Sequence, residues 1–185
     1  MPKIKISFTA LLIIPAVIFD PSGTVFSTVL AATLHELGHL AVIYFAGIGA
    51  KEVSITPYGL EISTKRQYRS FLEEIAVSVA GCIVNFLTFS LFWRFTGAIK
   101  ALAYASLMLG VLNALPVLSL DGGEALRAFF SIIFSHKRAE RLSRTVSFIT
   151  LLCLWCIAVY IFLFSGYNYS LFIMAVWLFG KIYLT

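Results

Sequence analysis

Three ionisable side chains lie within five consecutive positions of a long apolar run. The run is Thr24–Gly49, and the residues are His35, Glu36 and His39 in the sequence His-Glu-Leu-Gly-His. Ionisable groups at bilayer depth are costly, and they are rare unless they pair, face a cavity or hold an ion. The run therefore predicts a membrane helix with a polar centre, for which a bound metal is the strongest explanation.

The composition places the rest of the chain in a membrane as well. Hydrophobic residues make up 60% and charged residues 12% of the 185 positions, and the mean hydropathy is +0.94. A soluble core of this size does not need so much apolar surface. The net charge of +5 is spread between apolar runs without a stacking or groove-binding pattern, which argues against a nucleic-acid partner. We expect an all-α polytopic membrane protein with a single membrane-embedded domain, residues 1–185.

About six segments are predicted to cross or enter the membrane. The fourth is too long for one regular helix, because Pro116 and the glycine pair Gly122-Gly123 interrupt it. We expect a helix to about Leu112, an extended stretch, and a second helix from Gly123. The six segments are Ile6–Phe19, Thr24–Gly49, Phe71–Phe95, Ala98–Phe134, Val146–Phe164 and Tyr169–Leu184.

A small membrane-associated β-hairpin is predicted after the second segment. Glu52–Thr56 and Leu60–Ser63 each alternate polar and apolar residues, and Pro57-Tyr58-Gly59 between them is a turn signal. A plain amphipathic loop is the alternative. An edge strand of such a hairpin can pair with an extended substrate.

The basic residues predict the orientation in the membrane. With the N-terminus in the cytoplasm, Arg94 and Lys100 are the only two of the 14 Lys and Arg that fall outside. This asymmetry favours both termini in the cytoplasm. The remaining basic residues are Lys3, Lys5, Lys51, Lys65, Arg66, Arg69, Arg127, Lys137, Arg138, Arg141, Arg144 and Lys181.

The spacing of His35 and His39 suits a shared metal ion. On a helix they lie one turn apart and face the same way, so their imidazoles can bind one zinc, and H-E-x-x-H is a known zinc-site motif. Zinc lowers the pKa of water that it binds, and Glu36 can accept the released proton and return it to a leaving amine. A buried structural histidine pair is the alternative.

A catalytic zinc site usually has three protein ligands, so the histidine pair needs a partner. Asp121 is the acidic residue, besides Glu36, that a broken membrane segment carries to bilayer depth. Gly122 and Gly123 after it allow close backbone approach and unusual dihedral angles. Asp121 could instead, or in addition, cap the following helix. His136 is the weaker candidate, because the basic stretch around it is predicted to be a loop in water.

The motifs together resemble those of the site-2 protease family of intramembrane zinc metalloproteases. His35–His39 matches the family's first motif, and Asn113–Pro116 followed by Leu120–Gly123 matches its second. Ala80–Asn85 resembles its small-residue motif that ends in a polar position. The resemblance spans roughly residues 24–125, the expected catalytic core.

The resemblance implies roles for individual residues. One Zn²⁺ per chain would be held by His35, His39 and Asp121, with Glu36 as the catalytic acid and base. Asn113 would hold the substrate or the transition state by hydrogen bonding, and a helix-packing amide is the alternative for it.

The resemblance also implies regulated intramembrane proteolysis, with cleavage of a transmembrane or membrane-associated protein near the cytoplasmic face. The six-segment layout looks similar to the branch that processes pro-sigma-K, although this sequence shows no CBS or PDZ module. The expected partners are the lipid bilayer of a prokaryotic cell membrane, a substrate such as an anti-sigma or pro-sigma type regulator, and membrane regulator proteins. Two other functions remain open. One is a non-proteolytic protein that binds a metal or a membrane partner, and the other is a metal transporter, which would need repeated ligands along several helices.

Overall fold

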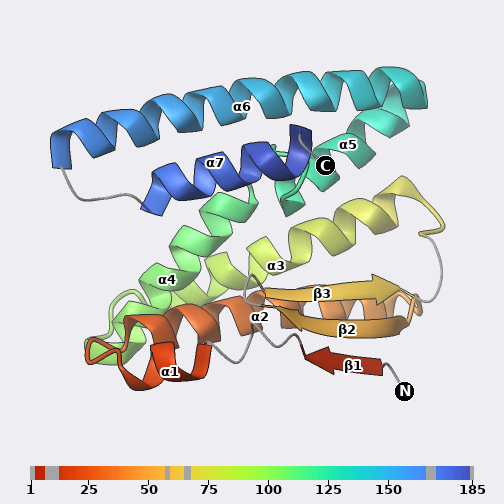
Figure 1. Ribbon diagram of the computed structural model, residues 1–185. Coiled ribbons are helices and arrows are strands. Elements are labelled where there is room, and N and C mark those ends of the chain that lie inside the picture. The colour runs from red at the N-terminus through yellow and green to blue at the C-terminus, as the bar shows by residue number, and fades with distance from the viewer. Residues whose placement is uncertain (1–2, 7–12, 57–58, 65–67, 166–169, 184–185) are drawn as a thin grey trace. The chain divides into compact units, whose positions relative to one another are not determined.

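The computed structural model describes residues 3–6, 13–56, 59–64, 68–165 and 170–183. They form two compact units, Met1–Asn113 and Ala114–Thr185 (Figure 1). The first unit contains β1 (Lys3–Ile6), α1 (Ile13–Ile18), α2 (Thr24–Phe45), β2 (Ala50–Thr56), β3 (Gly59–Thr64), α3 (Phe71–Phe92) and α4 (Gly97–Asn113). The second contains α5 (Asp121–Ile133), α6 (His136–Ser165) and α7 (Ser170–Tyr183).

Within the described residues, three helices are long and apolar enough to cross a membrane, by length and composition: α2, α3 and residues 136–164 of α6. Helix α4 and Leu171–Gly180 of α7 are apolar but shorter. The predicted count of six is therefore not supported. The clearest difference is the first predicted segment, whose described part holds only the six-residue α1, far short of the roughly 20 residues of a straight span. Residues 7–12 of that segment lie outside the described residues.

Helix α2 turns one narrow face towards α3 and α4, with which it packs. Its buried residues include Ser27, Ala31, His35, His39 and Ile43, spaced by four. Residues four apart share a helix face, so the two histidines lie on the face that packs against the neighbouring helices rather than towards lipid.

Helix α3 begins where the sequence supplies a reciprocal cap. The Ser70 hydroxyl accepts a hydrogen bond from the Glu73 N–H at 3.2 Å, and the Glu73 carboxylate accepts one from the Arg69 N–H at 2.8 Å. Such an arrangement satisfies backbone donors that a helix start leaves unpaired. It fixes the start of the helix whose buried face meets the two histidines.

Small side chains let α4 approach α3 closely. The buried residues of α4 are Ala103, Ser106 and Gly110, and a Cβ placed on Gly110 would lie 3.2 Å from the Cβ of Asn85 on α3. Small residues at helix contacts are typical of membrane bundles, where packing rather than the hydrophobic effect holds helices together.

The strand pair predicted after the second apolar segment is present. β2 and β3 pair in antiparallel fashion, for example Val53 with Ile62, and the predicted turn residues 57–58 lie outside the described residues. β1 adds to the other side of β2 in parallel, which gives the order β1-β2-β3. The sheet lies beside α2, which β3 and β2 contact (Figure 1).

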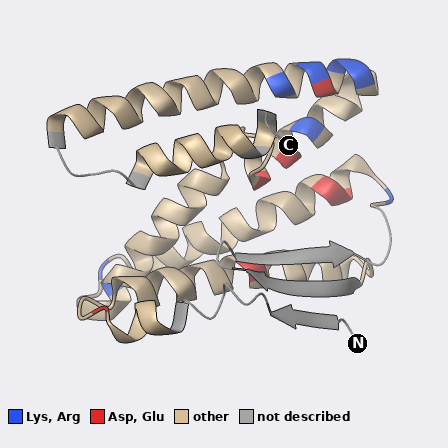
Figure 2. Ribbon diagram, viewed as in Figure 1, with Lys and Arg blue, Asp and Glu red and all other residues tan. Residues whose placement is uncertain are grey.

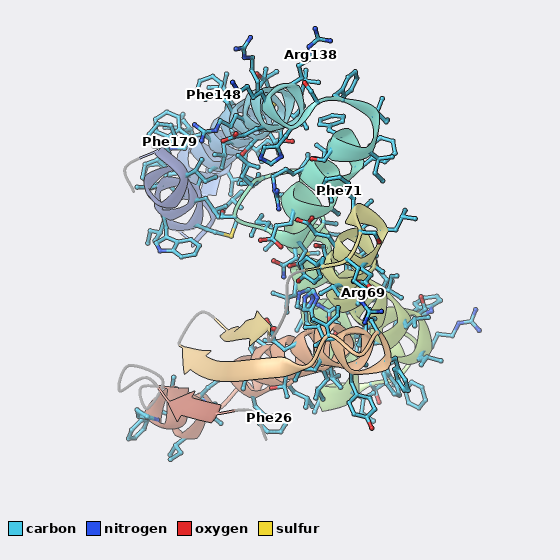
Figure 3. The ribbon with its side chains drawn as sticks, turned by 90° about the vertical axis from the view of Figure 1, so that its right-hand side faces the viewer. Phe26, Arg69, Phe71, Arg138, Phe148 and Phe179 are labelled. Atoms are coloured by element: carbon cyan, nitrogen blue, oxygen red, sulfur yellow. The ribbon has the colours of Figure 1, made fainter. Side chains whose placement is uncertain are left out.

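The second unit is built around α6, against which α5 and α7 pack (Figure 1). Val117, Leu151, Leu154, Ala175 and Leu178 form its buried apolar cluster. Figure 3 labels Phe148 of α6 and Phe179 of α7, which line a cavity between these two helices.

The loop predicted around His136 is wrong, because α6 begins at that residue. Its first turns are charged rather than apolar, so a hydropathy pattern does not indicate a helix there. Glu140 and Arg144 form a salt bridge at 2.9 Å across one helical turn, as residues four apart on a helix can. Lys and Arg residues gather at this end of α6 (Figure 2), and the Arg138 side chain projects away from the helix (Figure 3).

Candidate metal centre

The imidazoles of His35 and His39 meet on the buried face of α2. Their Nε2 atoms are 3.1 Å apart, and the rings stand edge to face with centroids 4.8 Å apart. The side chains are 4% and 8% exposed, so water does not compete freely for the two nitrogens. The prediction that a helical i, i+4 pair brings them together is confirmed.

Helix α3 holds the outer nitrogen of each ring. The Nδ1–H of His39 donates to the Val77 carbonyl at 2.7 Å, since a carbonyl oxygen can only accept. The Nδ1 of His35 lies 3.1 Å from the amide of Asn85. Each histidine therefore contacts α3 through its Nδ1, while its Nε2 faces the other ring.

Gly81 leaves the space in which the two rings meet. A Cβ at this position would lie 2.5 Å from the Nε2 of His39 and 2.6 Å from that of His35. Such distances are far below van der Waals contact, so no larger residue fits without displacing a ring. The backbone of α3 thus forms a wall directly beside the paired nitrogens.

The arrangement fits a divalent metal ion such as zinc. Because Val77 fixes the Nδ1 proton, the Nε2 of His39 carries a lone pair that points at the other imidazole. Two nitrogens 3.1 Å apart and each roughly 2.0–2.1 Å from one zinc would subtend about 95–100° at the metal, close to the tetrahedral angle.

Two other predicted site residues belong to the same unit. Glu36 follows His35 on α2 and is half-buried, and Asn113 is the last residue of α4 and is also half-buried. Their predicted catalytic roles stay predictions, since they depend on where a substrate lies.

Asp121 opens α5 in the second unit. The break predicted in the fourth apolar segment is confirmed, with α4 ending at Asn113 and α5 starting at Asp121. The alternative of an Asp121 cap is wrong, because the N-cap residue is Leu120 and no side chain caps the helix. The role of Asp121 as third ligand stays a prediction.

The segment between α4 and α5 is folded into turns rather than extended. Leu120 N–H donates to the Val117 carbonyl at 2.8 Å, and Leu118 N–H donates to the Ser147 hydroxyl at 3.2 Å. Gly122 and Gly123 allow the start of α5 to lie close to the backbone of the preceding turns. A Cβ added to Gly122 would lie 2.2 Å from the Ala114 carbonyl oxygen, and one added to Gly123 would lie 2.1 Å from that of Val117. Unusual dihedral angles are not the reason, since neither glycine has positive φ.

The roles of Val77, Gly81 and Asn85 behind the histidines were not predicted from the sequence. The sequence shows Ala80–Asn85 only as a small-residue motif that ends in a polar position. The signal was their spacing of four residues, which places all three on one face of α3. A backbone carbonyl such as that of Val77 leaves no trace in a sequence.

Comparisons with known proteins give a matching family model and similar sequences. The peptidase family M50 model matches residues 89–157. Stage IV sporulation protein FB of Bacillus subtilis is 28% identical over 135 residues, which cover 69% of this chain and 47% of that protein. The zinc metalloprotease MJ0392 of Methanocaldococcus jannaschii is 25% identical over 126 residues, 63% of this chain and 37% of that protein. The chain thus spans about half or less of the length of these relatives.

A solved structure shares the fold. The site-2 protease from Methanocaldococcus jannaschii superposes with a TM-score of 0.67 at 20% sequence identity, covering 95% of this chain and 86% of that one. The resemblance to the site-2 protease family, peptidase family M50, is thereby confirmed. The apolar helices among the described residues suggest an integral membrane protein.

Proposed function

We propose that this protein is an intramembrane zinc metalloprotease that hydrolyses a peptide bond of a transmembrane or membrane-associated protein near the cytoplasmic face. The observation that carries the proposal is the His35–His39 pair, whose Nε2 atoms lie 3.1 Å apart on a membrane-length helix. Buried imidazoles at that depth are costly without an ion. The peptidase M50 match over residues 89–157 supports the same reaction class.

The proposed metal site contains one zinc ion held by His35, His39 and Asp121. Bound zinc supplies Lewis-acid activation of water and of the scissile carbonyl. Glu36 removes a proton from the attacking water and delivers it to the leaving amine. Asn113 orients the substrate by hydrogen bonding to its backbone, which must leave the helical state for its peptide bond to be exposed.

The sheet offers a way to hold such an unwound segment. β3 is an outer strand of the order β1-β2-β3 and lies beside α2, the helix that carries the histidines. An extended substrate segment can add to an outer strand through backbone hydrogen bonds. The proposed substrate class is a membrane-bound regulator of the anti-sigma or pro-sigma type, which the family resemblance implies.

Replacing Glu36 by Gln tests the chemistry apart from metal binding. The amide cannot act as a base, so cleavage of a co-expressed membrane substrate should fall by about 10²–10⁴-fold, while zinc content in the purified protein stays the same. Glu140→Gln is the matched control, because Glu140 is an exposed carboxylate paired with Arg144 on α6. Undiminished cleavage by Glu36→Gln would refute the assigned base.

Replacing Asp121 by Ala tests the third ligand. Two histidines alone hold zinc weakly, so zinc per chain measured by atomic emission after dialysis should fall well below that of the wild type. Glu124→Ala on the same helical turn is the control, since its side chain is exposed. A zinc content equal to that of the wild type would remove Asp121 from the ligand set.

A further inference from the structure

We propose that Asn85 is a positioning residue of the metal centre, whose side-chain carbonyl accepts the Nδ1–H of His35 and so aims the Nε2 lone pair at the metal. This inference rests on the proposed metal site. Asn85 is fully buried, with 0% of its surface exposed, and its amide lies 3.1 Å from His35 Nδ1.

The orientation of the amide decides what Asn85 does. With Nδ2 towards His35, the amide donates to Nδ1, the proton moves to Nε2, and that nitrogen cannot bind a metal. With the amide reversed, Oδ1 accepts from Nδ1–H and Nε2 is free to ligate. The two ends of an Asn amide have nearly the same shape, so both orientations occupy the same space.

Apart from His35, no described residue forms a hydrogen bond with the Asn85 amide that would fix its orientation. Oδ1 has no partner among the described residues when Nδ2 faces His35, and reversal exchanges one unpartnered end for the other. The tautomer of His35 therefore decides the orientation of the Asn85 amide. A histidine that binds a metal through Nε2 carries its proton on Nδ1, the outer nitrogen. His39 already shows this arrangement, because the Val77 carbonyl can only accept from its Nδ1–H.

Three residues on one face of α3 together position the two histidines. Val77 orients His39, Gly81 leaves space for both Nε2 atoms, and Asn85 orients His35, at intervals of four residues along one face. On the far side, Gly110 of α4 approaches to where a Cβ would lie 3.2 Å from the Asn85 Cβ. This close packing holds the amide in place and keeps water from replacing it.

Asn85→Leu and Asn85→Asp separate the acceptor role from packing. Leu keeps the approximate volume without a polar group, so zinc affinity measured by competition with a fluorescent chelator should fall about 10–100-fold, the usual cost of losing such a partner. Asp keeps an acceptor and cannot donate when ionised, so it should bind zinc at least as tightly as the wild type. Thr88→Val is the control, because Thr88 is a buried α3 residue whose hydroxyl donates to Val84 of its own helix, and its zinc affinity should be unchanged.

Nitrogen-15 NMR of histidine-labelled, zinc-loaded protein gives a second readout. The chain has three histidines, so the imidazole signals can be assigned by single replacements. The His35 Nδ1–H should be protected from solvent exchange in the wild type and Asn85→Asp, and exposed to exchange in Asn85→Leu.

Each outcome has a defined meaning. If Asn85→Asp loses zinc as Leu does, the amide acts as a donor or a spacer and the inference fails. If Asn85→Leu binds like the wild type, the inference also fails while the metal site stands. If Asn85→Leu does not fold, the comparison of Asp with the wild type still decides. A wild-type chain that binds no zinc would refute the proposed function together with the inference.

Discussion

At the residue scale, Gly81 shapes the metal centre by lacking a side chain. Two imidazole nitrogens occupy the volume of its absent Cβ, at 2.5 and 2.6 Å from where that atom would be. The rings can move away only by breaking the hydrogen bond of His39 to Val77 or the contact of His35 with Asn85. The pair is thus held from two sides with little freedom.

Replacing Gly81 by Ala should therefore disrupt the metal site. We expect zinc affinity to fall at least about tenfold, because the added methyl forces one ring out of its position and such shifts at supporting contacts weaken metal binding. Chelator competition on purified protein measures this. Ser90→Thr adds one methyl to an exposed position of the same helix and should leave affinity unchanged. Equal affinity in Gly81→Ala would show that the rings are not constrained as described.

Sequence reasoning reached the ligating side chains but not their supports. His35 and His39 were found because ionisable residues stand out in an apolar run and because helical geometry alone places them together. In the sequence Asn85 stands out only as the polar end of a small-residue motif, since its contact with His35 joins positions 50 residues apart. Contacts between helices depend on how these pack, which local pattern does not determine.

At the element scale, the start of α5 depends on backbone-to-backbone packing. The turns between α4 and α5 fold back so closely that a Cβ on Gly123 would lie 2.1 Å from the Val117 carbonyl oxygen. Val117 is itself fully buried in the apolar cluster of the second unit. Neither partner can move without disturbing that cluster.

Gly123→Ala should thus destabilise the fold rather than merely adjust it. Overpacking of this kind costs about 1–3 kcal/mol or more, and about 2–4 °C of midpoint is lost per kcal/mol in a chain of this size. Thermal unfolding in detergent, followed by circular dichroism, measures the shift. Ser131→Thr, which adds one methyl elsewhere on α5, should change the midpoint far less, and an equal effect of both would contradict the packing argument.

The sequence predicts the helix break signalled by proline and glycine, and the strands signalled by alternating polar and apolar residues. It does not predict the charged start of α6 or the strand β1, which pairs with a distant segment. Pro116 and the glycines after Asp121 revealed the helix break, and alternation revealed β2 and β3. The first turns of α6 were missed because four basic residues hide their helical tendency from a hydropathy pattern. β1 was missed because it pairs with β2 across a sequence separation of 49 residues, Ile4 with Val53 for example, which no local signal reports.

At the scale of the whole molecule, charge and aromatic residues together predict how the chain lies in a membrane. The apolar part of α6, residues 146–164, is about 28 Å long at ~1.5 Å per residue, close to the ~30 Å of bilayer hydrocarbon. The turns before it carry Lys137, Arg138, Arg141 and Arg144 (Figure 2), and an excess of such residues marks the cytoplasmic side.

The two basic residues near the start of α4 lie against aromatic rings. The Arg94 guanidinium is 5.0 Å from the Trp93 ring centroid, and the Lys100 ammonium is 6.0 Å from that of Tyr104. Cations on aromatic rings suit a membrane interface. We therefore expect this end of α3 and α4 to face the outside, with both termini in the cytoplasm.

Cysteine labelling tests this orientation. In a chain with Cys82, Cys153 and Cys156 replaced by Ala, Arg94→Cys should react with a membrane-impermeant maleimide in intact cells, whereas Arg138→Cys should react only after permeabilisation. Both side chains are exposed, so access to the thiol reports the side of the membrane. The reverse pattern would invert the topology. His39 lies nearer than His35 to the C-terminal end of α2, which is expected to face the cytoplasm. With the topology inverted, that end would face the outside, and the catalytic water would have to enter from outside the cell.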